Sequence, residues 1–120
     1  MPARKDAFAD RLSRSREINL TVIGRNSGRA ISIPVWFVAE GERLYLLPVH
    51  GSDTQWYKNV LKNRSVRIDC RGAQAELDVD PITDQAQVSP VVEKFAAKYG
   101  DDNMKRYYSK LDVAVVGQAR

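Results

Sequence analysis

Hydrophobic and polar residues alternate along several stretches of the chain, and this alternation predicts β-strands. In the first stretch Ile18, Leu20 and Val22 alternate with other residues, and β-branched side chains dominate. Pro34 lies inside the second stretch and marks an edge, a bulge or a bend, because proline cannot donate a ladder hydrogen bond. Together the pattern predicts six strands, at about residues 18–23, 30–39, 43–49, 65–71, 73–79 and 111–116.

Apolar residues at helical spacing predict two or three helices. A basic amphipathic helix is expected at about residues 3–14 and a second helix at about 54–63. A third helix is expected to start at Thr83 or Ser89, with Pro90 tolerated in its first turn. The residues after this helix are polar and lead to the last strand.

Short connections between the strands determine the expected architecture. Tight turns join most consecutive strands, which favours an antiparallel barrel over a wound α/β sheet. We therefore expect a mainly β fold of the α+β class, a six-stranded antiparallel barrel with two or three flanking helices. At 120 residues it would be a single domain over residues 1–120.

The composition narrows the class of protein. Hydrophobic residues are 43% and charged residues 28% of the chain, as in ordinary globular proteins. One cysteine excludes an intrachain disulfide, and one histidine with one cysteine makes a poor zinc site. No apolar run reaches the ~20 residues of a membrane span, and the N-terminus does not resemble a secretory signal. A cytoplasmic location is the expectation.

The net charge of +4 is concentrated at the start of the chain. Residues 1–30 hold seven Lys and Arg against three acidic residues, whereas the remaining 90 residues hold twelve of each. This excess suits an anionic partner such as a phosphorylated ligand or nucleic acid, or it is a solvated helix face.

A glycine-rich hairpin loop at residues 24–29 is the first candidate site. Its backbone amides could form an anion-binding nest, and its arginines offer bidentate geometry for phosphate or carboxylate. An ordinary charged hairpin is the equal alternative. The candidate residues are Arg25, Asn26, Ser27, Gly28 and Arg29.

Aromatic residues give two further candidates. Trp56 and Tyr57 follow a turn and begin a helix, where free amides and flat rings suit an anionic or carbonyl-bearing ring system. An aromatic residue at a helix start more often belongs to the core. Tyr107 and Tyr108 form the other pair and have the same two interpretations, with one ring expected to pack and the other to line a pocket. No nucleophile–base pair is recognisable, and Cys70 is expected to pack within its strand.

The order of these motifs resembles the split β-barrel flavin and deazaflavin oxidoreductases. It is similar in particular to the nitroreductase and quinone-reductase-like branch that uses the 8-hydroxy-5-deazaflavin coenzyme F-420, in the pyridoxamine-phosphate-oxidase-like fold. The resemblance covers about residues 18–80, with a weaker match near the C-terminus. It rests on the segments 20–29, 33–38, 41–46, 56–63 and 66–68 together with Gly51.

This resemblance implies a split barrel and a cofactor site. The hairpin residues from Arg25 to Arg29 would hold the phosphate end of the cofactor, although Asn26 stands where the family usually has a cation. Tyr107 or Tyr108 would be catalytic by positioning substrate or donating a proton. The ring system would lie against His50, Gly51, Trp56 and Asn59.

The expected function is therefore hydride transfer from a flavin-type cofactor, F-420 or FMN, to a small quinone- or nitro-type electrophile. The family also implies a homodimer, for which Trp36 and Phe37 would suit the interface unless they are core. Alternatives are a non-catalytic barrel that binds flavin, haem or lipid, and a small nucleic-acid-binding barrel. The nucleic-acid-binding barrel is the weakest of these alternatives, because few aromatic residues and cations are interleaved along the chain.

Overall fold

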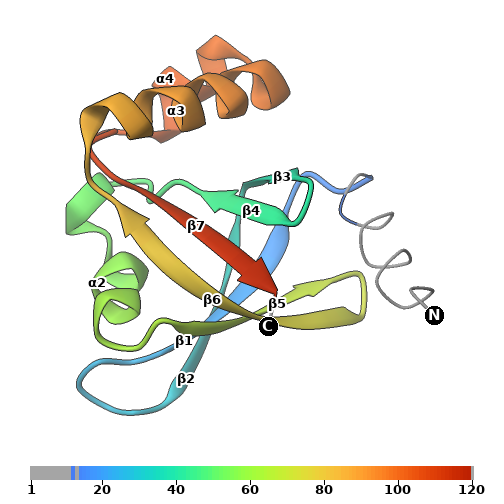
Figure 1. Ribbon diagram of the computed structural model, residues 1–120, viewed down its shortest axis with the longest axis vertical. Helices are drawn as coiled ribbons and strands as arrows, with labels where there is room; N and C mark the ends of the chain where they lie inside the picture. Colours follow the sequence, from blue (N-terminus) through green and yellow to red (C-terminus); the bar gives the residue numbers. More distant parts are fainter. Residues whose placement is uncertain (1–11, 13, 120) are drawn as a thin grey trace.

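A computed structural model describes Leu12 and residues 14–119, which form a curled antiparallel sheet and three α-helices (Figure 1). The strands are β1 (Ile18–Ile23), β2 (Ala30–Val35), β3 (Phe37–Glu40), β4 (Arg43–Leu46), β5 (Ser65–Cys70), β6 (Ala73–Ile82) and β7 (Ala114–Ala119). The helices are α2 (Gln55–Lys62), α3 (Gln85–Tyr99) and α4 (Asp101–Tyr107), and η1 (Gly51–Asp53) is a short 3-10 turn.

The expected α+β fold with an antiparallel sheet is confirmed, but the count of six strands is wrong. The described residues form seven, because the strand predicted over residues 30–39 divides at Trp36 into β2 and β3. Pro34 lies just before the division and has no N–H with which to extend the ladder. The predicted hairpin of residues 65–71 and 73–79 is confirmed as the β5–β6 pair.

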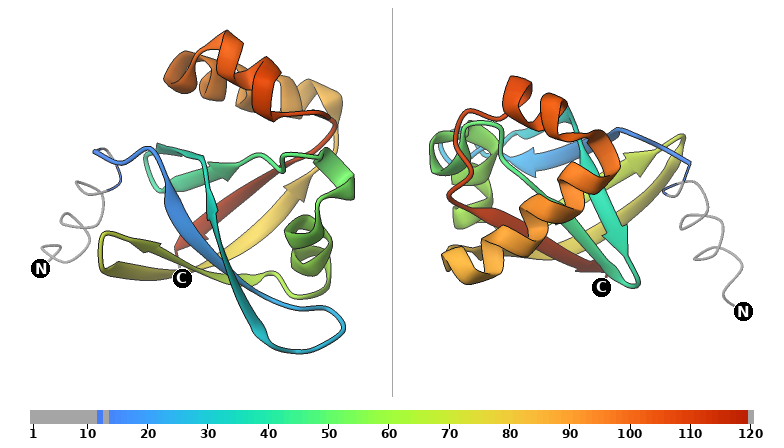
Figure 2. Two further views of the ribbon diagram at one scale, coloured as in Figure 1. Left: turned by 180° about the vertical axis from the view of Figure 1, so that it is seen from behind. Right: turned by 90° about the horizontal axis from the view of Figure 1, so that it is seen from above.

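The division at Trp36 also explains the curl of the sheet. The strand order is β2-β1-β5-β6-β7-β4-β3, so two strands that are consecutive in the chain form the two edges. Because a single residue joins them, the sheet must roll until its edges approach each other, as Figure 2 shows.

The inner face of the curled sheet encloses one core. Alternate residues of β1, β4, β5, β6 and β7 point inward, and Trp56, Tyr57 and Val60 of α2 close one side. Cys70 belongs to this core and its thiol lies 3.2 Å from the Ser15 hydroxyl, as expected for a packed strand residue. The predicted helix over residues 3–14 lies outside the described residues except for its end, where Leu12 joins the same core.

A second core lies between the outer face of the sheet and the helices α3 and α4 (Figure 1). It contains Tyr45 of β4, Phe95 and Tyr99 of α3, and Met104 of α4. The helix α4 was not predicted, because its sequence is polar and Met104 is its only buried residue.

Two helix starts differ from the prediction. The Asp84 carboxylate caps α3 by accepting from Ala86 N at 3.0 Å, so neither Thr83 nor Ser89 is the start. Pro90 therefore lies inside the helix and not in its first turn. None of the helices in the described part of the chain is long and apolar enough to span a membrane.

Candidate functional site

An aromatic groove of about 450 Å³ is the candidate site. Its size lies within the usual range for small-molecule sites, and such sites are mostly apolar with a few polar groups. Segments that are far apart in the chain build it, from β1 to the end of α4. Its walls are Glu17, Ile33, Pro34, Val35, Trp36, Leu47, Val49, Trp56, Tyr107 and Tyr108.

Trp36 is at the centre of the aromatic contacts. Its indole stacks on the Tyr99 ring with centroids 4.2 Å apart and an interplanar angle of 7°. Tyr107 meets it edge-on at 5.4 Å, and Tyr108 is tilted against it at 6.0 Å. These stacked and perpendicular arrangements are the favoured ones for aromatic pairs, so the rings hold one another in place.

The last turn of α3 fixes the backbone next to Trp36. The Tyr99 hydroxyl accepts from Phe37 N at 3.1 Å and lies 2.7 Å from the carbonyl oxygen of Arg16. Lys98 Nζ donates to the carbonyl oxygen of Phe37 at 2.8 Å. Phe37 is fully buried and therefore belongs to the core, whereas Trp36 is partly exposed and packs on Tyr99.

Burial changes the acidity of three side chains around the groove. It raises the pKa values of Tyr99 and Tyr108, so both hydroxyls stay protonated at neutral pH. Burial also lowers the pKa of Lys98 to about 8, and the positive charge of Arg16 acts in the same direction. Tyr107 differs from Tyr108 because half of its surface is exposed.

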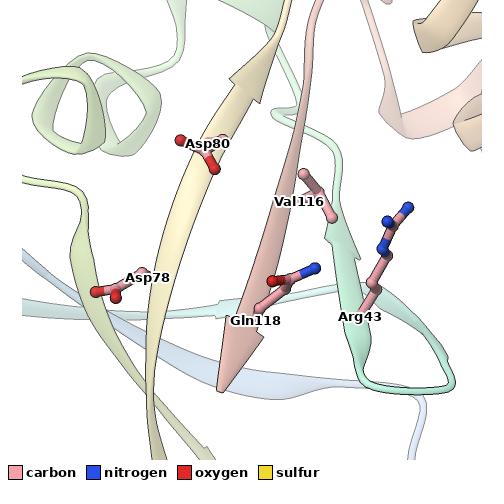
Figure 3. Close-up of a pocket in the computed structure, with 5 residues that line it drawn as sticks. All are labelled: Arg43, Asp78, Asp80, Val116 and Gln118. Carbon is pink, nitrogen blue, oxygen red and sulfur yellow. The ribbon is translucent and has the colours of Figure 1, made fainter. Parts of the chain in front are cut away.

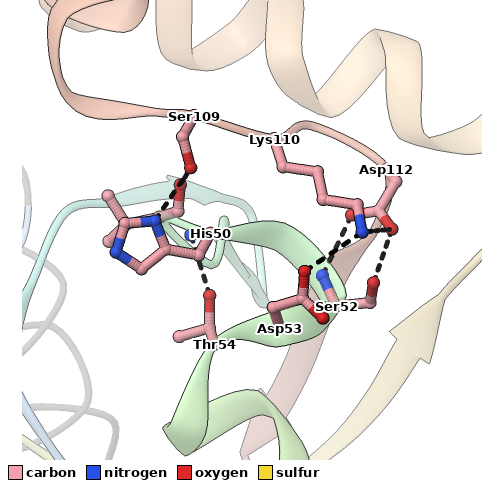
Figure 4. Close-up of polar contacts among 8 residues, drawn as sticks. His50, Ser52, Asp53, Thr54, Ser109, Lys110 and Asp112 are labelled. Atoms are coloured by element: carbon pink, nitrogen blue, oxygen red, sulfur yellow. Dashed lines mark hydrogen bonds and ion pairs between the residues drawn. The ribbon is translucent and has the colours of Figure 1, made fainter.

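A polar clamp joins the loop before α2 to the loop after α4, beside the groove (Figure 4). His50 Nδ1 lies 2.8 Å from the Ser109 hydroxyl, and His50 N donates to Thr54 Oγ1 at 2.8 Å. The Asp112 carboxylate accepts from both the backbone N and the hydroxyl of Ser52, at 3.0 and 2.6 Å. Although partial burial opposes ionisation, these bonds leave the pKa of Asp112 below its ordinary value.

Gly51 makes the clamp possible. Its φ is +56°, a conformation that side chains rarely adopt, and a Cβ at this position would overlap Asp112 Oδ1. The glycine therefore shapes the loop, and nothing in the clamp places it on the groove wall.

The cationic hairpin is tied to α2 through Arg25. The Asn59 side-chain oxygen accepts from the backbone N of Arg25 at 3.1 Å and from its guanidinium at 2.7 Å. The same guanidinium donates to Gln55 Oε1 at 2.8 Å, and Lys62 Nζ donates to the Arg25 carbonyl at 3.0 Å. Asn59 is buried, and its side-chain oxygen holds the hairpin on α2.

The rest of the hairpin is open. Asn26, Ser27, Gly28 and Arg29 are exposed, and the Ser27 hydroxyl accepts from Arg29 N at 3.2 Å. Gly28 has a φ of +72°, which supports its predicted role in the turn.

The structure thus separates the predicted site residues into three groups. Trp56, Tyr107 and Tyr108 meet in the groove, Arg25 meets Asn59 at α2, and His50 with Gly51 lies in the clamp. The groove residues Glu17, Leu47 and Val49 were missed. Their sequence signal is weak: Glu17 lies just before the first predicted strand, and Leu47 and Val49 lie in the last three residues of the third.

A second concavity, of about 360 Å³, lies on the outer face of β4, β6 and β7 (Figure 3). Its lining is polar and of mixed charge, and Arg64 pairs with Asp80 at 3.2 Å. It has no aromatic wall, so it does not compete with the groove as a ring-binding site. The lining residues are Arg43, Asp78, Asp80, Val116 and Gln118. Elsewhere in the described ranges, no group of three or more His, Cys, Asp or Glu is placed to hold a metal ion.

Residues 9–116 match the family described as an uncharacterized protein conserved in bacteria, DUF2255. The chain belongs to this family. No curated protein matches the sequence.

Solved structures show what the DUF2255 chain is similar to in three dimensions. The haem storage protein HutZ from Vibrio cholerae has a TM-score of 0.73 and 13% identity, over 97% of this chain and 89% of that one. An F420-H2-dependent reductase has a TM-score of 0.68 and 16% identity, over 86% and 94%. A domain-swapped dimer has a TM-score of 0.69 and 14% identity, over 95% and 98%. At these identities the likeness shows a shared split-barrel fold.

Proposed function

We propose that this protein is an oxidoreductase that uses a flavin-type cofactor, F-420 or FMN, to reduce a small quinone- or nitro-type electrophile. The aromatic groove carries the proposal, because Trp36, Trp56, Tyr107 and Tyr108 converge there beside a helix that also anchors a cationic hairpin. Such a cofactor supplies hydride transfer when bound, and the protein supplies binding, orientation and electrostatics.

The residues present fit a ligand with a flat ring and an anionic tail. The groove offers aromatic faces to the ring, and the hairpin offers the Arg29 guanidinium, the Ser27 hydroxyl and exposed backbone to the tail. Arg25 and Asn59 position the hairpin, while His50 and Gly51 position the loop beside the groove. Asn26 is exposed at the turn and adds an uncharged donor and acceptor.

Tyr107 and Tyr108 are proposed to act on the substrate. Both line the groove, and burial raises the pKa of Tyr108, which makes its hydroxyl a weaker acid. Tyr108 is therefore suited to position the substrate by donating a hydrogen bond to an oxygen that gains electrons. Tyr107, half exposed at the rim, is suited to contact the incoming substrate.

A titration with FMN and with F-420, followed by absorbance, tests the cofactor. Arg29→Ala is the informative variant, because Arg25 also holds the hairpin on α2. We expect saturable binding of one cofactor and a loss of about tenfold in Arg29→Ala, the size of a charge-assisted contact. Arg67→Ala on β5 is the matched control, because its guanidinium pairs with Glu76 and does not line the groove.

Two results would contradict the proposal. One is no binding of either cofactor to the wild-type protein. The other is binding that Arg29→Ala and Trp36→Ala leave unchanged, since the ligand would then occupy neither the hairpin nor the groove.

A homodimer is also proposed. Both edges of the sheet, β2 and β3, have one unpaired side, and a structural neighbour is a domain-swapped dimer. Light scattering at several concentrations would test this, and a concentration-independent monomer would contradict it.

A haem-binding protein is the second candidate, favoured by the likeness to HutZ. His50 follows the groove residue Val49, and a histidine nitrogen can ligate haem iron. A Soret titration of wild type and His50→Ala separates the candidates, because the histidine variant should lose haem binding but retain flavin binding.

A further inference from the structure

Among the described residues on the wall of the aromatic groove, one carries a charge, and that charge is negative. Glu17 lies just before β1 and is exposed there, and the other wall residues are apolar or aromatic. Among the described residues, no Lys, Arg or His lies within ion-pair distance of its carboxylate. The negative charge is therefore not neutralised by a close partner in this part of the chain.

Three of the described cations lie over tyrosine rings around the groove and are not among its wall residues. Arg16 lies 5.1 Å from the centre of the Tyr99 ring and Lys98 lies 5.0 Å from it. Arg106 lies 5.9 Å from the centre of the Tyr107 ring. None of the three lines the groove.

We infer that the groove selects flat aromatic ligands that carry a cationic amine over those that carry an acid group. Trp36 and Tyr107 both line the groove and meet at an interplanar angle of 75°, while Tyr99 stacks on one face of Trp36. The negative face of an aromatic ring attracts a cation, and a carboxylate at the same site adds an ion pair. Together these attractions favour a cationic ring over a matched anionic ring by about tenfold.

The inference rests on the proposed function in one respect: it names the substrate class of that groove, an amine-bearing quinone or nitroaromatic. The whole-protein charge of +4 would by itself favour anions. A preference for cations must therefore come from local groups. The negative charge of Glu17 would also orient a ligand that has an anionic tail, because the hairpin would attract the tail away from Glu17.

Tryptophan fluorescence offers a direct test. The chain has two tryptophans, and both line the groove, so quenching reports on this site. The probes are 9-aminoacridine, which is a cation at neutral pH, and anthracene-9-carboxylate, two three-ring systems of opposite charge. We expect the cation to bind about tenfold more tightly, and Glu17→Gln to reduce this preference to about twofold.

Matched variants keep the test specific. Glu93→Gln removes an equal charge from an exposed position of α3 outside the groove, and should leave the preference unchanged. Glu17→Lys should invert the preference. Melting curves check that each variant is folded before its binding is compared.

Equal binding of the two probes, tighter binding of the anion, or a preference that survives Glu17→Gln would each overturn the inference. The cofactor titration separates this failure from failure of the proposed function. Cation preference without FMN or F-420 binding contradicts only the oxidoreductase, and cofactor binding without cation preference contradicts only the selectivity.

Discussion

The hairpin and the groove are assembled in different ways, although both adjoin α2. The hairpin is one continuous segment, residues 24–29, which a single helix holds through the polar contacts of Arg25. The groove is assembled from segments between Glu17 and Tyr108, which ring stacking and the clamp hold together. Loss of a hairpin contact should therefore free a loop, whereas loss of a groove contact should destabilise the whole fold.

The largest effect is expected for Gly51→Ala, which disrupts the clamp beside the groove. A Cβ at this position would overlap Asp112 and approach the Lys110 carbonyl to 3.0 Å, at a φ of +56°. We expect a loss of about 3 kcal/mol in the free energy of unfolding, measured with urea.

Gly41→Ala is the matched control for this prediction. Its φ is +61°, but a Cβ there would meet nothing within 4 Å. Its cost should be the conformational penalty alone, about 1 kcal/mol. Equal losses in the two variants would show that the approach of Asp112 is unimportant.

A smaller loss is expected for Tyr99→Phe, which removes the hydroxyl that holds Phe37. The buried N–H of Phe37 would lose its acceptor, while the Phe37 carbonyl would keep Lys98. The expected cost is about 2 kcal/mol, with a shift in Trp36 fluorescence because the stacked ring rests on this residue. Tyr107→Phe should cost less than about 0.5 kcal/mol, because that residue is half exposed and its hydroxyl makes no hydrogen bond within the described part of the chain.

The same difference between the two regions decides what the sequence could predict. The hairpin was recognisable because its signal is local: Gly28 and the polar residues around it form a turn between two alternating stretches. The predicted strands around it and the β5–β6 hairpin were found for the same reason.

The groove could not be found in this way, because its walls meet only through the curl of the sheet. That curl depends on the division of β2 from β3 at Trp36. The residues around this division form a continuous apolar stretch, which gives no sequence signal that the chain changes direction there. Helix α4 was missed because its polar sequence buries only Met104, so helical periodicity is absent. Without α4, the place of Tyr107 and Tyr108 could not be deduced.

At the hairpin, Asn59→Ala tests whether a polar contact to one helix holds the loop. The variant removes the acceptor for the Arg25 backbone N and guanidinium. We expect a loss of about 1.5 kcal/mol and faster amide hydrogen exchange confined to residues 24–29. Asn26→Ala, at an exposed turn position, should change neither quantity, and faster exchange across the barrel in Asn59→Ala would contradict the comparison.

The smallest effect is a pH dependence at the groove, through Lys98. Burial lowers the pKa of this lysine to about 8 in the folded protein, against an ordinary 10.5. Below pH 8 it is charged in both the folded and the unfolded chain, and its burial as a cation costs stability. Between pH 8 and 10.5 the folded protein has released this proton while the unfolded chain retains it, so a rise in pH favours folding.

Because Lys98 is partly exposed, the gain should be below about 1 kcal/mol. Urea unfolding of wild type and Lys98→Met across this range isolates the contribution of Lys98, because all other side chains are the same in the two proteins. The wild type should gain stability relative to the methionine variant as pH rises. Parallel curves would contradict this prediction, because they would mean that the ammonium group is as well solvated in the folded protein as in the unfolded chain.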